Sequence, residues 1–378
     1  MQSIVIAGYA RSPFHPAGRG ALARVRPDDL AAQVIRGLIG RTGVDPAEVE
    51  DLVLGCAFPE GEQGLNVARL IGLLADLPIS VGGMTVNRFC GSSMSAIHYA
   101  AGQIAVGAGE VFICGGVESM SRVPIMGFNP LPNPELAKKS AAYMSMGETA
   151  ENVASQYGIG RVEQEALALE SQRRAAAAGS DGKFTDEIVP VETRAGTVCV
   201  DGTIRPETTA EGLAALKPAF DANGTVTAGT SSPLTDGAAA VLVTTQDYAR
   251  KHDLPILARI KAVAISGCAP EVMGLGPILS SRKAMQRAGI SVGDLDVVEL
   301  NEAFASQALA CIRDLGLDPA RTNIDGGAIA IGHPLGATGA RLVGKAASLL
   351  KREGGKYALA TQCIGGGQGI ATVLEAVE

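Results

Sequence analysis

The spacing of apolar and polar residues along the first 120 residues predicts a series of strands and helices in alternating order. Short apolar runs of the kind that form buried strands are each followed by a longer run with helical spacing. Strands are predicted at 3–9, 49–57, 82–89 and 110–119, and helices at 27–43, 66–78 and 93–109. Strands that alternate with helices are typical of a mostly parallel sheet covered by helices. The first part of the chain is therefore predicted to be α/β.

The last 120 residues repeat this order. Strands are predicted at 255–267, 295–301 and 357–367, with helices at 280–289 and 336–354. Residues 44–58 can be laid over 290–304, and residues 82–119 over 322–367, with the Gly-Gly pairs also aligned. The sequence therefore predicts two divergent copies of one α/β unit, related by a pseudo-twofold axis with their sheets facing each other.

Residues 121–245 break this pattern. They open with a proline-rich stretch at 122–136, continue with helical patterns at 147–158 and 161–179, and end in a Pro/Gly/Thr-rich region. Long loops carried by a rigid scaffold often supply ligand contacts. We therefore predict an N-terminal core half (1–120, completed by about 235–250), an inserted loop domain (121–245) over the ligand site, and a C-terminal core half (246–378).

Composition narrows the possible functions. The chain has 378 residues, of which 47% are hydrophobic, and a net charge of −7, which argues against a general nucleic-acid-binding face. Its seven cysteines are widely spaced without a Cys-x-x-Cys pair, so neither a disulfide framework nor a zinc site is expected. Neither a signal peptide nor a membrane span is predicted, and free thiols suit a reducing compartment. We expect a cytoplasmic protein.

Four residues whose side chains could take part in catalysis follow predicted strands, where open α/β sheets place their ligands. They are Cys90, Asn301, His333 and Cys363. Cys90 begins a predicted helix, whose dipole is expected to lower the thiol pKa and favour the thiolate. A buried, inert thiol is the alternative interpretation. The other three histidines have settings typical of structural residues.

The remaining three residues can assist a nucleophile in different ways. His333 lies between a glycine and a proline in a turn, and it is a candidate base for Cys90. Cys363 runs into three glycines, whose N–H groups can bind an oxyanion. Asn301 can hold a water or a carbonyl oxygen, or it can cap the helix that follows it.

Seven stretches of this chain together resemble the thiolase family, in order and over essentially the whole length. They are NRFCGSSM, GGVESMS, MGETAENVA, TAGTSSPLTDGAAA, NEAFA, GGAIAIGHPLGATGAR and CIGGGQG. The resemblance implies the thiolase fold: two duplicated βαβαβαββ domains in a layered α-β-α-β-α arrangement, with an inserted loop domain. It also implies an acyltransferase that cleaves 3-ketoacyl-CoA with CoA through an acyl-cysteine intermediate.

The resemblance assigns roles to individual residues. Cys90 is expected to be the acyl-accepting nucleophile, His333 its activator and an oxyanion donor, and Cys363 the acid/base at the α-carbon of acetyl-CoA. Asn301 is expected to hold a water that completes the first oxyanion hole, and the N–H groups of Cys90 and Gly365 the second. Ser232, Met146, Ala303 and Phe304 resemble positions along the pantetheine and acyl path. Coenzyme A is a substrate, and neither a cofactor nor a metal is expected.

The resemblance also indicates a branch of the family. The short connector before residue 147, and Ser145 where short-chain biosynthetic members carry histidine, resemble degradative 3-ketoacyl-CoA thiolases. We therefore expect medium-to-long acyl chains and a homodimer rather than a tetramer, and a β-oxidation hydratase/dehydrogenase is a candidate partner. Thr338 stands where serine is common. The alternatives are a biosynthetic acetoacetyl-CoA thiolase, a ketoacyl synthase, in which Cys363 would be a histidine or asparagine, and a non-catalytic CoA-binding subunit.

Overall fold

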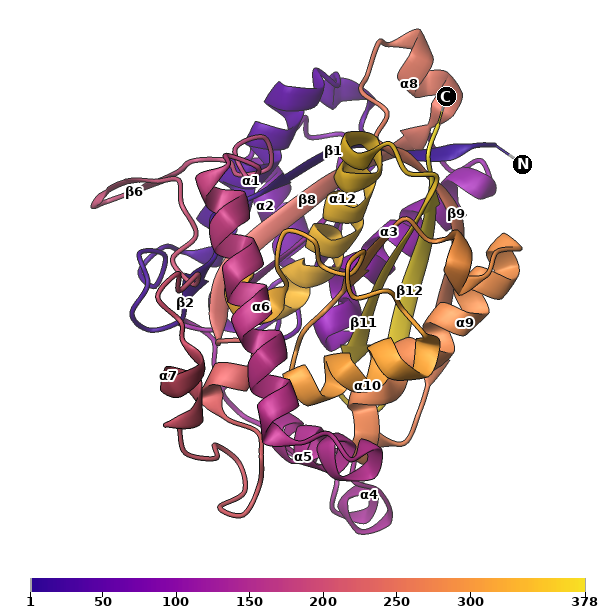
Figure 1. The fold of residues 1–378 in the computed structure, drawn as a ribbon. Helices are drawn as coiled ribbons and strands as arrows, with labels where there is room; N and C mark the ends of the chain where they lie inside the picture. Colours follow the sequence, from indigo (N-terminus) through magenta and orange to yellow (C-terminus); the bar gives the residue numbers. More distant parts are fainter. Residues whose placement is uncertain (1, 378) are drawn as a thin grey trace.

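The computed structural model describes residues 2–377, and most of its strands belong to one ten-stranded sheet (Figure 1). The separate hairpin of β6 and β7 is the exception. The strands are β1 (Ile4–Arg11), β2 (His15–Pro16), β3 (Asp51–Gly55), β4 (Gly82–Val86), β5 (Val111–Ser119), β6 (Val191–Thr193), β7 (Gly196–Val198), β8 (Thr235–Thr245), β9 (Ala258–Gly267), β10 (Val297–Leu300), β11 (Tyr357–Ile364) and β12 (Gln368–Glu375). The α-helices are α1 (Pro27–Thr42), α2 (Val67–Leu74), α3 (Ser92–Ala105), α4 (Pro134–Lys139), α5 (Met146–Tyr157), α6 (Arg161–Ser180), α7 (Ala210–Ala214), α8 (Gln246–Lys251), α9 (Gly276–Ala288), α10 (Ala305–Leu315), α11 (Ala328–Ile331) and α12 (Leu335–Glu353).

The strand order repeats between the two halves. It runs β1-β8-β5-β3-β4 in the N-terminal half and β9-β12-β11-β10 in the C-terminal half. A parallel bridge from Val298 to Thr322 takes the place that β4 has in the first half. The two halves join where β1 pairs with β9, at Val5 and Ile6. The predicted duplication is therefore confirmed, and residues 44–58 and 290–304 contain the equivalent strands β3 and β10.

Parallel pairing is confined to the outer strands of each half. β3 pairs in parallel with β4 and β5, and β10 with β11, whereas the other strand pairs of this sheet are antiparallel. β12 is antiparallel to β11 because only residues 365–367 separate the two strands. Gly366 and Gly367 have φ values of 78° and 86°, a conformation that a side chain would disfavour. The glycine run is thus required for this tight reversal beside Cys363.

Helices form three layers around the two halves. α3 and α12 lie in the middle and contact strands of both halves, whereas α1 and α2 cover the outer face of one half and α9 covers that of the other, with α10 packed on α9. α12 approaches its neighbours closely because it carries small residues. A Cβ placed on Gly339 would lie 2.3 Å from the backbone nitrogen of Met94 in α3. The result is the predicted α-β-α-β-α arrangement.

The segment between β5 and β8 contains the predicted long helices as α5 and α6, together with α4, α7 and the β6–β7 hairpin. It is anchored to β1 by buried charges. Arg11 donates to both carboxylate oxygens of Asp201 at 2.7 and 2.8 Å, and to Glu187 at 2.8 Å. The Arg11 side chain is fully buried, so these ion pairs are shielded from solvent screening.

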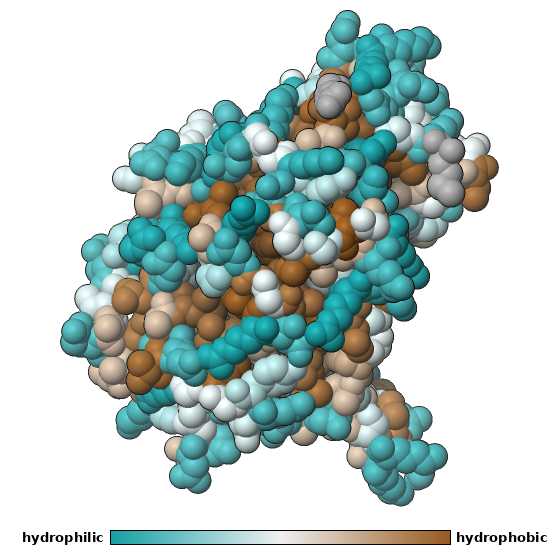
Figure 2. All heavy atoms as spheres, turned by 45° about the vertical axis from the view of Figure 1, so that its right-hand side comes forward, coloured by the Kyte–Doolittle hydropathy of each residue, from teal (hydrophilic) through white to brown (hydrophobic). Residues whose placement is uncertain are grey.

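The face shown in Figure 2 is covered largely by polar side chains, and apolar side chains are visible in the recesses between them. Among residues 2–377, none of the helices combines the length and the apolar content that crossing a membrane requires.

Candidate active site

Cys90 lies in a strained turn between β4 and α3. A short 3₁₀ helix covers Phe89–Gly91, and Phe89 has φ +43°, which is uncommon for a bulky residue. The side chain of Asn87 braces this turn, because its Oδ1 accepts from the N–H of Phe89 at 2.8 Å. Strain of this kind persists only where surrounding contacts hold it, and it is frequent at functional sites. The turn presents Cys90 just before the N-terminus of α3, as the sequence predicted.

The acidity of the Cys90 thiol differs from the prediction. Burial raises the pKa of Cys90 to about 11, although hydrogen bonds from the backbone N–H groups of Gly365 and of Cys90 itself oppose this shift. The expected lowering by the helix dipole is therefore wrong. Removing the sulfur from water disfavours the thiolate by more than the nearby N–H dipoles favour it. Cys90 rests as a thiol at neutral pH, and it needs a base before it can attack.

Cys363 and Gly365 reach Cys90 from the other half of the molecule. Cys363 is in β11 and fully buried, and Gly365 follows in the turn to β12. The backbone N–H groups of Gly365 and of Cys90 favour the thiolate form of Cys90 and so lower its pKa, against the effect of burial. Gln362 also donates to the carbonyl oxygen of Cys90. The pKa of Cys363 is raised well above its usual value, first by burial and then by the proximity of Cys90.

His333 is held in one tautomer. Its Nδ1 lies 2.6 Å from the hydroxyl oxygen of Thr338, and that hydroxyl donates its only proton to the carbonyl of Pro334 at 2.9 Å. The imidazole must therefore donate from Nδ1, which leaves a lone pair on Nε2. Burial, and secondarily the charge of Arg341, lowers the pKa of His333 to about 3. A neutral imidazole that carries a lone pair on Nε2 has the form that a base requires.

Asn301 lies beside His333 directly after β10. Its Nδ2 is 3.3 Å from the Nε2 of His333, and its backbone N–H donates to the carbonyl of Thr361 in β11 at 3.0 Å. The side-chain oxygen Oδ1 is buried without a hydrogen-bond partner among the described residues. Buried polar atoms are rarely left unpaired without a functional or solvent-related reason. Asn301 therefore presents an acceptor toward the space next to His333.

The two sides of the site meet through α12 and α3. α12, which follows His333, contacts the 3₁₀ turn that carries Cys90. The N–H of Ala340 donates to the hydroxyl of Ser93 at 2.9 Å, which ties the two helices together near their N-termini. Among the described residues, no hydrogen bond joins the sulfur of Cys90 to the ring of His333. The helix packing brings the thiol and the imidazole to the same end of the central layer.

Three of the four residues predicted along the substrate path lie beside Cys363. Met146, Ala303, Phe304 and Cys363 belong to one apolar cluster. The fourth, Ser232, is fixed to this group because its N–H and its hydroxyl donate to the carbonyl of Ala303 at 3.0 and 3.1 Å. The nine residues predicted from the sequence are thus joined by packing and hydrogen bonds into one region at the junction of the two halves.

Residues that support this region were missed by the sequence analysis. Glu118 and Glu302 are buried carboxylates at the ends of strands: Glu118 is the penultimate residue of β5, and Glu302 is the second residue after β10. Glu302 accepts from Ser171 at 2.7 Å and from Asn323 at 2.8 Å. Thr235 accepts from the N–H of His333 at 3.0 Å. An acidic residue at the end of an apolar strand was the available signal for both carboxylates, since such a group needs specific partners when buried.

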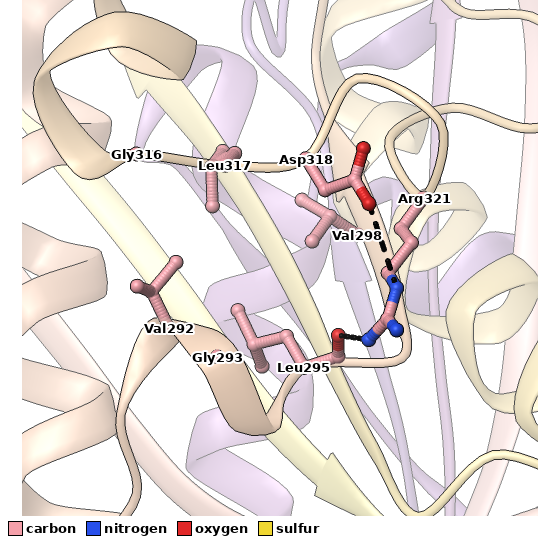
Figure 3. A pocket seen from close by; sticks show the side chains of 8 residues that line it. All are labelled: Val292, Gly293, Leu295, Val298, Gly316, Leu317, Asp318 and Arg321. Carbon is pink, nitrogen blue, oxygen red and sulfur yellow. Dashed lines mark hydrogen bonds and ion pairs between the residues drawn. The ribbon is translucent and has the colours of Figure 1, made fainter.

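A surface cavity of about 200 Å³ lies away from these residues (Figure 3). Its lining includes Leu295, Leu317 and Arg321, and Arg321 donates to the carbonyl of Leu295 at 2.7 Å. Arg321 also forms an ion pair with Asp318 at 3.6 Å. The carboxylate among its lining residues, Asp318, is paired with Arg321, and neither a cysteine nor a histidine is among them, so the cavity is a poor candidate for a second reaction centre.

Comparison with known families agrees with this geometry. Residues 4–247 match the model of the thiolase N-terminal domain, and residues 254–376 match that of the thiolase C-terminal domain. The chain belongs to the thiolase family. This thiolase is 46% identical to a 3-ketoacyl-CoA thiolase of Bacillus subtilis and 49% identical to one of Vibrio cholerae. Both alignments cover 99% of this chain and all of the relative.

Solved structures support the same assignment. The human mitochondrial 3-ketoacyl-CoA thiolase, solved in complex with CoA, superposes on this thiolase with a TM-score of 0.92. The two are 38% identical, and the superposition covers all of this chain and 98% of the human one. The expected fold is thereby confirmed, and this thiolase is an acyltransferase by family.

Proposed function

We propose that the chain cleaves 3-ketoacyl-CoA with free CoA, giving acetyl-CoA and a shortened acyl-CoA in a reversible reaction. One observation carries this proposal above the others: the backbone N–H groups of Cys90 and Gly365 favour negative charge at Cys90, and a second thiol, Cys363, is close enough for Cys90 to raise its pKa. Cleavage of a carbon–carbon bond next to a thioester needs one nucleophile and one separate acid, and the thiols of Cys90 and Cys363 can supply both. The names of the bacterial and human relatives agree with this reaction.

The first step follows from the protonation states of the two catalytic groups. The Cys90 sulfur attacks the keto carbon while Nε2 of His333 accepts the thiol proton. The former carbonyl oxygen becomes negatively charged, and the N–H groups of Cys90 and Gly365 stabilise it. Burial keeps the thiol and the imidazole neutral at rest, so the proton moves only when substrate is present.

The second step breaks the carbon–carbon bond. Its electrons pass to acetyl-CoA as an enolate, whose oxygen is stabilised by protonated His333 and by a water held at Oδ1 of Asn301. Cys363 then donates its proton to the α-carbon. The raised pKa of Cys363 suits this role, because the group holds a proton to give.

The third step frees the enzyme. The CoA thiol transfers its proton to the Cys363 thiolate and attacks the acyl group on Cys90. The acyl group leaves as shortened acyl-CoA, and the Cys90 sulfur recovers its proton from His333. In the opposite direction Cys363 acts as the base that removes an α-proton for condensation.

Two variants test the roles of the thiols. Cys90→Ala is expected to abolish the acyl-enzyme, measured as the mass increase of the protein after mixing with acyl-CoA. Cys363→Ala is expected to be acylated but to lose exchange of the α-protons of acetyl-CoA with deuterated water. Normal exchange by Cys363→Ala would show that its assigned role is wrong.

The substrate range and physiological direction belong to the same proposal. Met146 begins α5, and its sulfur lies 3.5 Å from the position of a Cβ built on Gly365. Met146 therefore faces the turn between β11 and β12 that carries Gly365. With Phe304 and Ala303 it forms an apolar wall, which favours medium-to-long acyl chains over a biosynthetic preference for acetoacetyl-CoA. Rates of thiolysis of acetoacetyl-CoA and of a long 3-ketoacyl-CoA distinguish these alternatives. A non-catalytic subunit would cleave neither of these two substrates.

We also infer a homodimer in the cytoplasm. β4 ends the strand order, so its outer edge is unpaired among residues 2–377, and Leu65 and Ile79 nearby are 89% and 84% exposed. An exposed strand edge with apolar neighbours is a natural site for a second copy. The seven free thiols suit a reducing compartment. Light scattering of the wild type and of Leu65→Glu/Ile79→Glu tests the dimer, since the charges should shift the mass toward the monomer.

A further inference from the structure

Glu118, the penultimate residue of β5, connects the two halves of the site. Its side chain is buried, and its carboxylate receives only donors. Oε2 accepts from the N–H of Ala57 at 2.8 Å and from that of Gly336 at 2.9 Å. Oε1 accepts from the N–H of Phe58 at 3.3 Å and from Nε2 of Gln63 at 2.9 Å.

The orientation of the Gln63 amide is fixed independently. Its oxygen accepts from the N–H of Ser119 at 2.6 Å, so its nitrogen must be the group that faces Glu118. The thiol of Cys56, 3.7 Å from Oε1, also donates to this carboxylate. Glu118 therefore accepts in each hydrogen bond that it makes. A glutamine in its place would direct its NH₂ group toward backbone donors in either orientation of the amide.

One contact of Glu118 leads to the nucleophile. The carbonyl of Ala57, whose N–H is bound by Glu118, accepts from Nδ2 of Asn87 at 3.0 Å. Oδ1 of the same asparagine accepts from the N–H of Phe89 and so supports the left-handed residue immediately before Cys90. Three consecutive hydrogen bonds thus run from Glu118 to the Cys90 turn.

The other contact leads to the base. Gly336 lies in the first turn of α12, three residues after His333, and its N–H is one that an α-helix leaves unpaired. A carboxylate is favoured there by the helix dipole. The backbones are also in close contact, because a Cβ on Gly116 of β5 would lie 1.9 Å from the carbonyl oxygen of Gly336.

We propose that Glu118 is a positioning residue: its Oε2 atom holds the first turn of α12, and with it His333, at a fixed place relative to the Cys90 turn. The proposal rests on the proposed function, in which His333 takes the proton of Cys90. This bridge by Glu118 matters because Cys90 and His333 come from different halves of the duplicated fold. A single carboxylate oxygen bonded to both halves fixes their separation more directly than the surrounding apolar packing.

A double-mutant cycle tests this role. The rate of Cys90 acylation by acetyl-CoA is measured in a single turnover by quench and mass spectrometry, for the wild type, Glu118→Gln, His333→Ala and the double variant. Glu118→Gln is expected to slow acylation about 100-fold, the scale of a misplacement near 1 Å. The dissociation constant of CoA should stay within about twofold, because the substrate path is untouched. In the His333→Ala background, Glu118→Gln should cause no further loss beyond about twofold.

The outcomes separate the two proposals. If the losses of the single variants multiply, Glu118 acts independently of His333 and the positioning role is wrong, while the proposed function stands. If His333→Ala acylates at the wild-type rate, the proposed function itself is wrong. Asn87→Ala covers the case in which Glu118→Gln does not fold: Asn87 is exposed, and its loss should also slow acylation. A wild-type rate in Asn87→Ala would refute the connection to Cys90.

Asp325→Asn is the matched control. Asp325 is also buried and also binds α12, but toward its C-terminus, through Lys345 at 2.8 Å and Arg352 at 2.7 Å. This variant is expected to lower the melting temperature while acylation stays within about twofold of wild type. If it slows acylation as much as Glu118→Gln, general loosening of α12 explains the effect and the positioning role of Glu118 is overturned.

Discussion

The hydroxyl of Thr338 accepts a hydrogen bond from Nδ1 of His333 at 2.6 Å, and it does so because its own proton is committed to the carbonyl of Pro334. Thr338, five residues after His333 and one turn into α12, thereby decides which nitrogen of the imidazole carries the lone pair. Thr338→Val keeps the shape and removes the hydroxyl. We expect it to lower kcat/KM roughly 10- to 100-fold, because part of the population would hold the proton on the wrong nitrogen. Thr338→Ser keeps the hydroxyl and should stay near wild type. A kcat/KM of Thr338→Val equal to that of the wild type would contradict the tautomer assignment.

The pKa of Cys90, about 11, predicts how the resting thiol reacts with an alkylating agent. Because only the thiolate reacts, the rate of Cys90 modification by iodoacetamide should rise about tenfold per pH unit between pH 7 and 10. The measurement is peptide mass spectrometry of timed samples, with exposed Cys199 as the reference thiol in the same samples. A rate that levels off near neutral pH would indicate a resting thiolate and restore the influence of the α3 dipole.

The close approach of β5 to α12 leaves no room for a side chain at Gly116. Gly116→Ala is expected to lower the free energy of unfolding by about 1–3 kcal/mol, because backbone must move to accept the methyl group. Gly40 in α1 is the control, since nothing lies within 4 Å of a Cβ placed there. Gly40→Ala should stabilise the protein by about 0.5–1 kcal/mol through helix propensity and chain entropy. Urea unfolding measures both, and equal effects would contradict the packing argument.

The buried ion pair of Arg11 and Asp201 attaches the inserted segment to β1. Asp201→Asn is expected to destabilise the protein by about 3–5 kcal/mol, because it leaves a buried guanidinium short of one counter-charge. Lys138→Gln removes an exposed ion pair with Glu135 in α4, and it should change stability by less than about 0.5 kcal/mol. Comparable losses of stability in the two variants would mean that the burial of Arg11 does not determine how much stability its ion pair contributes.

The sequence predicted the elements because their signals are local. Apolar spacing located α1, α3 and α12 and the strands around them, and the repeated order of these elements revealed the duplication that the strand order confirms. The candidate residues were also found locally, because Cys90 and Asn301 follow strands and Cys363 lies near the end of one, and strand ends are where such folds place chemistry. His333 instead follows the short helix α11, so the strand predicted before it is wrong. Their assigned roles came from the resemblance to thiolases.

The tertiary structure decided what depends on surroundings. The pKa of Cys90 moved opposite to the local prediction, since the dipole of α3 is a property of its own segment but desolvation is imposed by the other half of the chain. The bridge that Glu118 makes between Ala57 and Gly336 likewise depends on distances between residues remote in sequence. Periodicity places a side chain on a face of its helix or strand, whereas water exclusion and hydrogen-bond partners exist only after the two halves have packed.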